Sequence, residues 1–236
     1  MEKKQKNHNS KNIVKKESIK EEEEEIAKPK ANRDKEVIWV LIVMGVLLAV
    51  VLLTYYFVQS SKHFNYEGLT FTKELFGKIP VYHYSYYFND STGKLYQYNL
   101  FLRNDPRSNE VPVSGDPILF SAGRFTYVSI NSTGLKECDN SSIAIAGLAS
   151  FFADNKLNVK GATPDKEEAL NKSLRYVTCA IDSDDNVVEI FVGNQTKITN
   201  KGNCHKIEVS DCQILQATEK FVTQTVIDAK NSANNA

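Results

Sequence analysis

Residues 37–58 read VIWVLIVMGVLLAVVLLTYYFV, a run of 22 residues without one charged side chain. Since an α-helix rises about 1.5 Å per residue, the run would cover roughly 33 Å, close to the ~30 Å hydrocarbon thickness of a bilayer. The run therefore predicts one transmembrane helix. That helix would place the 36 residues before it and the 178 residues after it in different compartments.

Basic residues near the ends of the run predict its orientation. Five lie in the twenty residues before it and three in the twenty after it, and positive charge tends to stay on the cytoplasmic side. The tail is therefore expected inside the cell and the large domain outside. A cleaved signal peptide would also deliver the domain outside, but the stretch before the run is too long for one and no small-x-small cleavage site precedes residues 55–57. Trp39 and the aromatic residues 55–57 instead fit the two membrane interfaces.

Cysteines and glycosylation acceptor patterns lie only after the apolar run. The four cysteines are an even number on the predicted oxidising side, which favours disulfides between Cys138, Cys179, Cys204 and Cys212. The pattern Asn-x-Ser/Thr occurs five times after the run and never before it, and random placement of Ser and Thr is the alternative explanation. The possible glycosylation sites are Asn89, Asn131, Asn140, Asn171 and Asn194.

Residues 1–36 form a charged tail with 11 basic and 9 acidic residues and few aliphatic ones. The conformational entropy lost on ordering such a tail would exceed the free energy gained by burying its few apolar side chains. The tail is therefore expected to be disordered in the cytoplasm. It would act as a solvated tether; alternatively, basic residues 28–35 would lie against anionic headgroups while the acidic block 21–25 offers a docking strip. The rest of the chain, with 18 basic and 20 acidic residues, lacks the positive field that nucleic-acid binding requires.

Residues 64–230 are expected to form one extracytoplasmic α+β domain, joined to the helix by a linker at 59–63. Its first half reads as strands, because aromatic and polar residues alternate after residue 79. The Ser-Thr-Gly sequence at 91–93 fits a three-residue hairpin loop, which would place Tyr86 opposite Tyr98 and make one face of both strands apolar. For these tyrosines, core packing is favoured over binding of sugars or peptides.

The second half mixes helices and strands. A helix through residues 143–152 and a strand at 157–160 suggest a β-α-β unit. A short helix would follow with Thr163 as its cap, and a final helix would run from about residue 211 to 230 before a frayed end at 231–236. Further strands are expected at 69–73, 117–120, 125–130, 175–180, 187–192, 195–199 and 205–209, with hairpins joining 175–180 to 187–192 and 187–192 to 195–199.

Two disulfide arrangements fit these strands. Residues 205–209 would separate Cys204 from Cys212 by roughly 20 Å or more, whereas a disulfide needs Cα atoms within about 7 Å, so this local pair is disfavoured. The predicted turn at 193–194 would return Cys204 to the end of the sheet that holds Cys179. This favours Cys179 with Cys204 and Cys138 with Cys212 over the swapped arrangement.

No catalytic, metal or cofactor motif stands out in the domain. The cysteines could form a zinc site with His205, but the C-x-x-C clip is absent, and its absence also argues against a redox enzyme. Asp182, Asp184 and Asn186 have the spacing that opens a calcium loop, but the later Gly and Glu are missing. There is no G-x-S-x-G, H-E-x-x-H or phosphate loop. Histidines for nucleophile chemistry are limited to His63, His83 and His205.

Five short segments carry a resemblance to a known group of proteins. They are Ile143-Ala-Ile-Ala-Gly-Leu148, Val159-Lys-Gly-Ala-Thr163, Tyr176-Val-Thr-Cys179, Asn203-Cys-His-Lys-Ile207 and Asp211-Cys-Gln-Ile-Leu215. With these segments the chain resembles uncharacterised single-pass membrane proteins of small-genome archaea, over roughly residues 64–230. The resemblance implies a prokaryotic cell membrane, and no activity or functional residue comes with it.

The sequence thus favours a single-pass protein of the cell membrane whose external domain binds or organises another envelope protein, with the lipid bilayer as its second partner and no cofactor. The alternative is an extracytoplasmic hydrolase with a carboxylate- or metal-based site. A deep pocket that combines His83 or His205 with two carboxylates would favour the hydrolase, whereas a flat aromatic or apolar patch would favour binding.

Overall fold

The structure, a computed structural model, describes residues 31–60, 62–90, 92–121, 123–181 and 184–235. The chain divides into two compact units, residues 1–60 and residues 61–236. In the first unit, helix α2 (Ala31–Ser60) contains the predicted span, and its segment Lys35–Ser60 is long and apolar enough to cross a membrane. The side chains of residues 35–60 are exposed on all sides and most of them are apolar, which is typical of a helix that meets lipid. Most of the predicted tail, residues 1–30, lies outside the described residues.

The first sheet of the second unit is an antiparallel meander of four strands, β1 (His63–Tyr66), β2 (Leu69–Phe76), β3 (Ile79–Asn89) and β4 (Leu95–Leu102). Strands β3 and β4 have the predicted register, with Tyr86 opposite Tyr98. Gly93 adopts a left-handed φ of 79°, and the Asp90 N–H donates to the Lys94 oxygen at 3.0 Å, which closes the predicted loop.

The second sheet has seven strands in the order β5-β10-β11-β9-β6-β7-β8. Neighbouring strands are parallel except for β10 and β11, which form an antiparallel hairpin. Strand β6, helix α3 (Ser141–Asp154) and β7 form the predicted β-α-β unit. The strands are β5 (Val113–Gly115), β6 (Phe125–Ile130), β7 (Asn158–Thr163), β8 (Arg175–Tyr176), β9 (Asn186–Val192), β10 (Lys197–Lys201) and β11 (Cys204–Val209).

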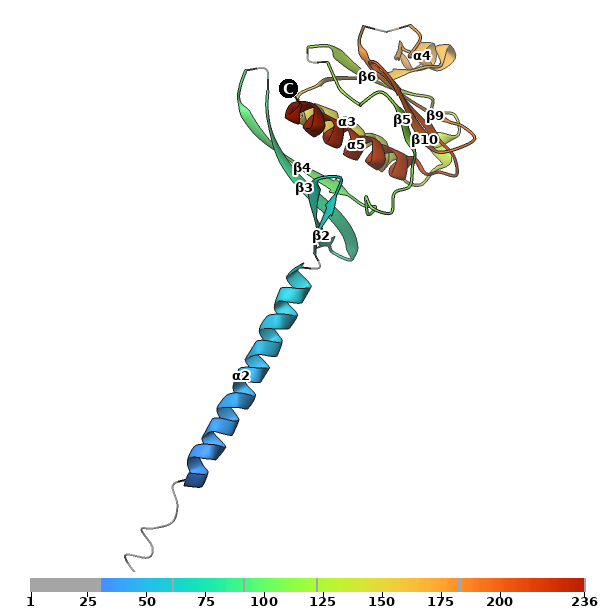
Figure 1. Cartoon of the computed structure of the whole chain (residues 1–236). Helices are drawn as coiled ribbons and strands as arrows, with labels where there is room; N and C mark the ends of the chain where they lie inside the picture. The colour runs from blue at the N-terminus through green and yellow to red at the C-terminus, as the bar shows by residue number, and fades with distance from the viewer. Residues whose placement is uncertain (1–30, 61, 91, 122, 182–183, 236) are drawn as a thin grey trace, which may run out of the picture. The chain divides into compact units, whose positions relative to one another are not determined.

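Helices α3 and α5 (Ile214–Asn234) pack against each other in a layer between the two sheets (Figure 1). One hydrophobic core joins all three layers. Its largest side chains come from the four-stranded sheet, the helices and the seven-stranded sheet in turn: Phe71, Tyr82, Phe152, Phe221, Ile190 and Ile207. The described part of the chain therefore confirms an α+β domain with a C-terminal helix.

The predicted hairpin between residues 175–180 and 187–192 is wrong. Only Arg175 and Tyr176 form a strand, β8, which pairs with β7 in parallel. The chain then crosses the face of the seven-stranded sheet that is turned away from the helices. Side chains of the sheet hold it there: Ser129 Oγ donates to the Val177 oxygen at 2.6 Å, and Glu189 Oε2 accepts from the Cys179 N–H at 3.3 Å.

The predicted hairpin between residues 187–192 and 195–199 is also wrong, because β9 pairs with β11 rather than with β10. Gly193 instead lies close to a side chain of the adjacent strand. A Cβ at Gly193 would lie 2.2 Å from Glu208 Oε1, so a larger residue at this position would displace the Glu208 side chain. Residues 117–120 form no strand, and the edge of this sheet is instead the short β5.

Two predicted helix starts are also corrected. The short helix α4 (Lys166–Lys172) is capped by Asp165, whose carboxylate accepts from Glu167 and Glu168, because Thr163 is buried at the end of β7. The last helix begins three residues later than predicted, since Asp211 and Cys212 have left-handed φ values of 49° and 58°. It continues to Asn234, through most of the segment that was expected to fray.

Candidate functional site

Strand β4 is the long unpaired edge of the four-stranded sheet. In an antiparallel pair, every second residue turns its backbone groups away from the partner strand. The hydrogen bond from the Asp90 N–H to the Lys94 oxygen sets this alternation. The backbone N–H and C=O groups of the even-numbered residues of β4 therefore point toward β3. The N–H and C=O groups of four odd-numbered residues point outward, and no described residue pairs with them: Leu95, Gln97, Asn99 and Phe101.

Glu219 of helix α5 closes one end of this edge. The next outward N–H in the series belongs to Arg103, and it donates to Glu219 Oε1 at 2.6 Å. Asn104 donates to Oε2 through its backbone N–H at 3.0 Å and its Nδ2 at 2.7 Å. Burial of the Glu219 carboxyl raises its pKa above the ordinary value, although these donors act in the opposite direction. A carboxylate thus already fills one acceptor position that the carbonyl of an added strand would take.

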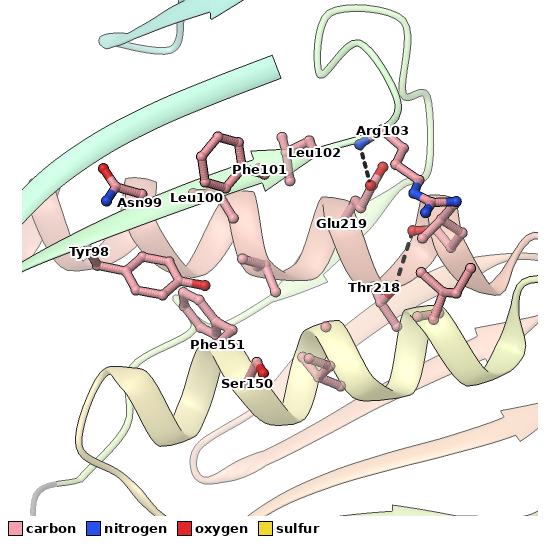
Figure 2. A pocket seen from close by; sticks show the side chains of 16 residues that line it. Tyr98, Asn99, Leu100, Phe101, Leu102, Arg103, Ser150, Phe151, Thr218 and Glu219 are labelled. Carbon is pink, nitrogen blue, oxygen red and sulfur yellow. Dashed lines mark hydrogen bonds between the residues drawn. The ribbon is translucent and has the colours of Figure 1, made fainter. Parts of the chain in front are cut away.

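A groove lies between β4 and helices α3 and α5 (Figure 2). Tyr98 reaches from β4 toward α3, where its ring meets the Phe151 ring edge-on with 5.7 Å between centroids, and burial raises the pKa of Tyr98 to about 12. Ile143 and Gly147 line the α3 side. The groove measures about 230 Å³, below the roughly 300–1,000 Å³ of small-molecule pockets. Its size suits individual side chains of a bound segment better than a cofactor.

A second, larger pocket of about 640 Å³ lies under β3, beside the C-terminal ends of α3 and α5. Its lining is mostly apolar and includes Tyr84, Tyr86 and Phe88. The hydroxyl of Tyr86 donates to Asn155 Oδ1 at 2.6 Å, and burial raises the pKa of Tyr86. The tyrosine stripe that the sequence assigned to core packing therefore packs only in part, because Tyr84 and Tyr86 line this space and are half-buried.

The outer face of the four-stranded sheet carries a hydrogen-bonded cluster around His83. Its Nδ1 lies 3.2 Å from Glu74 Oε1, and its Nε2 lies 3.0 Å from Ser85 Oγ, which is the order of groups in a serine hydrolase triad. However, the Ser85 hydroxyl donates to Asn99 Oδ1 at 2.7 Å, and the Phe101 ring stacks on the imidazole at 4.6 Å. The cluster also lies on an open strand face, and the unpaired N–H groups of Asn99 and Phe101 point along the plane of the sheet rather than toward the Ser85 hydroxyl, so they do not form an oxyanion hole there.

His205 is fully buried on β11 in the helix-facing core. Its Nδ1 lies 3.1 Å from Asn200 Oδ1, and its ring packs against Phe120 and Phe221. Its Nε2 and the Nδ2 of Asn200 have no hydrogen-bond partner in the described part of the chain. Burial lowers the pKa of His205 to about 4, so the imidazole is neutral at pH 7. No carboxylate among the described residues pairs with it, which argues against the deep acidic pocket expected for a hydrolase.

The four cysteines form disulfides, Cys138 with Cys212 and Cys179 with Cys204. This is the connectivity that the sequence favoured, although the turn on which that preference depended does not form. With their sulfurs bonded to each other, these cysteines offer no thiolates for the zinc alternative. His205 and Cys204 are also neighbours on one strand and so face opposite sides of the sheet.

One residue of the alternative calcium site is not available to bind a metal. Asn186 is buried, and its side chain bonds to the backbone of Ser121 and to Thr126. Residue 182 lies outside the described residues. Among the residues that the structure describes, no group of three or more His, Cys, Asp or Glu side chains is placed to hold a metal ion.

The possible glycosylation sites are spread over the domain rather than gathered at the groove. Asn131 is half-buried, and its Oδ1 accepts from the Thr133 N–H at 3.0 Å. The other four side chains are exposed, and their modification stays a prediction: Asn89, Asn140, Asn171 and Asn194.

Comparison of the chain with protein-family models, with curated proteins and with solved structures found no match. The groove beside β4 is therefore known only from its own geometry. Sequence reasoning missed it because the alternation at residues 95–102 predicts a strand but does not reveal that one side of that strand is unpaired. The signal that could have helped is Phe101, an aromatic residue on the polar face of the predicted hairpin, which is 56% exposed.

Proposed function

We propose that the protein is a membrane-anchored binding module of the cell envelope, with its N-terminus in the cytoplasm and its domain outside. Helix α2 would hold it in the bilayer, and the domain would bind an extended segment of another envelope protein along β4. The disulfides are consistent with an oxidising compartment for the domain.

The free edge of β4 is the observation that carries this proposal. Four residues present unpaired N–H and C=O groups in a row, and such an edge is a template for an added strand. The groove beside it could receive alternate side chains of that strand, with Phe151 and Ile143 as apolar contacts. The Glu219 carboxylate already accepts from Arg103, which indicates that this edge binds an oxygen acceptor where one is offered.

A photo-crosslinking experiment in the membranes of the producing cells would test this site. A crosslinking residue at Ile143, 43% exposed beside the groove, should capture a specific partner, whereas one at Leu170, 83% exposed on α4, should not. In the same background, N99P removes one outward N–H without touching the bonds to β3, and N99A keeps that N–H. We expect N99P to weaken binding by roughly tenfold and N99A to retain it. Equal capture by both variants, or capture at both crosslinking positions, would contradict the proposal.

The predicted topology has its own test. Protease added to intact cells should digest the domain and spare residues 1–36. Free thiols in freshly quenched cells, or digestion of the tail instead of the domain, would reverse the proposed orientation.

Hydrolysis is the second candidate function, because Ser85, His83 and Glu74 are in triad order. A fluorophosphonate probe, which labels activated serines covalently, distinguishes the two candidates. The binding proposal predicts no labelling at Ser85. Labelling that S85A and H83A both abolish would favour the hydrolase.

A further inference from the structure

The turn between β2 and β3 forms an exposed apolar tip. Leu75 is 72% exposed, Phe76 80% and Ile79 48%. Gly77 opens this two-residue turn with a φ of 65°, as tight hairpins favour. Adjacent large apolar side chains that nothing else in the described domain covers mark a contact surface.

The strand register shows which way this tip points. Thr72 of β2 faces His63 of β1, and the Lys73 N–H donates to the Lys62 oxygen at 2.7 Å. Beyond Lys73, β2 continues without β1 beside it, toward the side from which the chain enters the sheet. At about 3.3 Å per residue, Gly77 reaches roughly 13 Å past Lys62.

The connection to the apolar helix is short. Helix α2 ends at Ser60 and β1 begins at His63, so only two residues lie between them. At most about 3.6 Å per residue, Lys62 lies within roughly 7 Å of Ser60. If α2 crosses a bilayer, Lys62 is therefore held at the membrane surface, and the tip is long enough to reach it.

The charge near the tip suits an anionic surface. Lys62, Lys73 and Lys78 lie on this end of the sheet, and two carboxylates near them are already paired, Glu74 with His83 on the outer face and Asp105 with Arg107. Basic side chains beside exposed apolar ones are the composition of segments that bind lipid headgroups and insert into the interface.

We propose that the β2–β3 turn is a membrane-contacting element, in which Leu75, Phe76 and Ile79 enter the interface of the bilayer that holds α2, while Lys73 and Lys78 contact anionic headgroups. This inference rests on the membrane anchoring in the proposed function. It adds a second attachment beside α2, which would fix the tilt of the domain and keep the edge of β4 at a constant orientation to the membrane.

Tryptophan fluorescence of the full chain in nanodiscs tests the contact. Trp39 is the one native tryptophan, so W39F gives a background into which F76W is introduced. L95W is the matched control, because Leu95 is 62% exposed on the same sheet but at its opposite end, about 33 Å along β3. Each variant is measured with ordinary lipid and with lipid brominated in the acyl chains, which quenches only tryptophan that contacts the hydrocarbon.

We expect F76W to emit at shorter wavelength than L95W and to lose most of its emission in brominated lipid, while L95W loses almost none. Replacing Lys73 and Lys78 by Gln should reduce this quenching, as should lipid without anionic headgroups. An L75W variant repeats the test if F76W disturbs the turn. An unquenched F76W and L75W would overturn the proposal, and a blue-shifted but unquenched F76W would indicate a protein contact instead. Native Trp39 distinguishes failure of the tip contact from failure of the membrane anchoring. Quenching of Trp39 by brominated lipid shows that α2 lies in lipid, whether or not the tip also does. An unquenched Trp39 would overturn both the anchoring and the tip contact.

Discussion

The buried imidazole of His205 predicts that acid destabilises the domain. Its pKa of about 4 in the folded protein lies below the ordinary value of 6.5, because burial disfavours the charged form. A histidine with a lowered folded-state pKa stabilises the fold above pH 6.5, where it is neutral in both states. That contribution is lost as the pH falls from 6.5 toward 4, since the unfolded chain then binds a proton that the folded one does not.

The size of the effect follows from the two pKa values. A difference of one in pKa corresponds to about 1.4 kcal/mol, so the full difference between 6.5 and about 4 is worth about 3 kcal/mol. Between pH 7 and pH 4.5 the linkage relation gives a loss of about 2 kcal/mol from this one residue. The imidazole is fully buried, so solvent screening does not reduce this figure as it would at the surface.

Urea unfolding of the full chain in nanodiscs at both pH values, followed by near-ultraviolet circular dichroism, measures this loss. H205Q is the control, because glutamine does not titrate and its amide can still donate to Asn200 Oδ1. All other ionisable side chains are the same in both proteins, so their contributions cancel in the comparison. We expect the wild type to lose about 2 kcal/mol more than H205Q between pH 7 and pH 4.5. An equal loss in both proteins would refute the reasoning.

Two further predictions concern the disulfides and Glu219. For a sequence separation of 74 the chain-entropy relation gives about 4.5 kcal/mol, and for 25 about 3.5 kcal/mol, so removing Cys138–Cys212 as C138A/C212A should destabilise the domain more than C179A/C204A in urea unfolding. The reverse order would show that local packing outweighs loop length. The raised pKa of Glu219 means that its ionisation opposes folding as the pH rises above 4.5, so E219Q should gain stability relative to the wild type between pH 4 and pH 7. A difference between the two proteins that does not change with pH would contradict this.

The hairpin of β3 and β4 could be predicted because its information is local. The loop at residues 91–93 fixes which residues face each other, and a slip by one position would place the aromatic residues opposite Gln97 and Asn99. The observed pairing of Tyr86 with Tyr98 follows from these two constraints. Periodicity likewise located α3, and the absence of charge at residues 37–58 located α2.

Strand pairing in the seven-stranded sheet could not be predicted in the same way. Residues 187–192 are a nearly continuous apolar run, which fits a strand buried on both faces between parallel neighbours. The hairpin interpretation followed the glycine at position 193, but that glycine makes room for Glu208 of a strand that pairs from further along the chain. Glycine is the sequence signal both for a tight turn and for the close approach of another strand, so the sequence did not distinguish the two.

The sequence by itself determined the apolar helix, the α+β class, the register of one hairpin and the even set of cysteines after the apolar run, because each depends on residues near one another in the chain. Only the tertiary structure decided that β4 is an edge, that a groove lies between it and α3, that His205 is buried without a carboxylate, and that the β2–β3 turn extends past the point where the chain enters the sheet. These features depend on which segments that are distant in the sequence pack together. That packing is determined by the burial of apolar side chains and the hydrogen bonding of the whole domain.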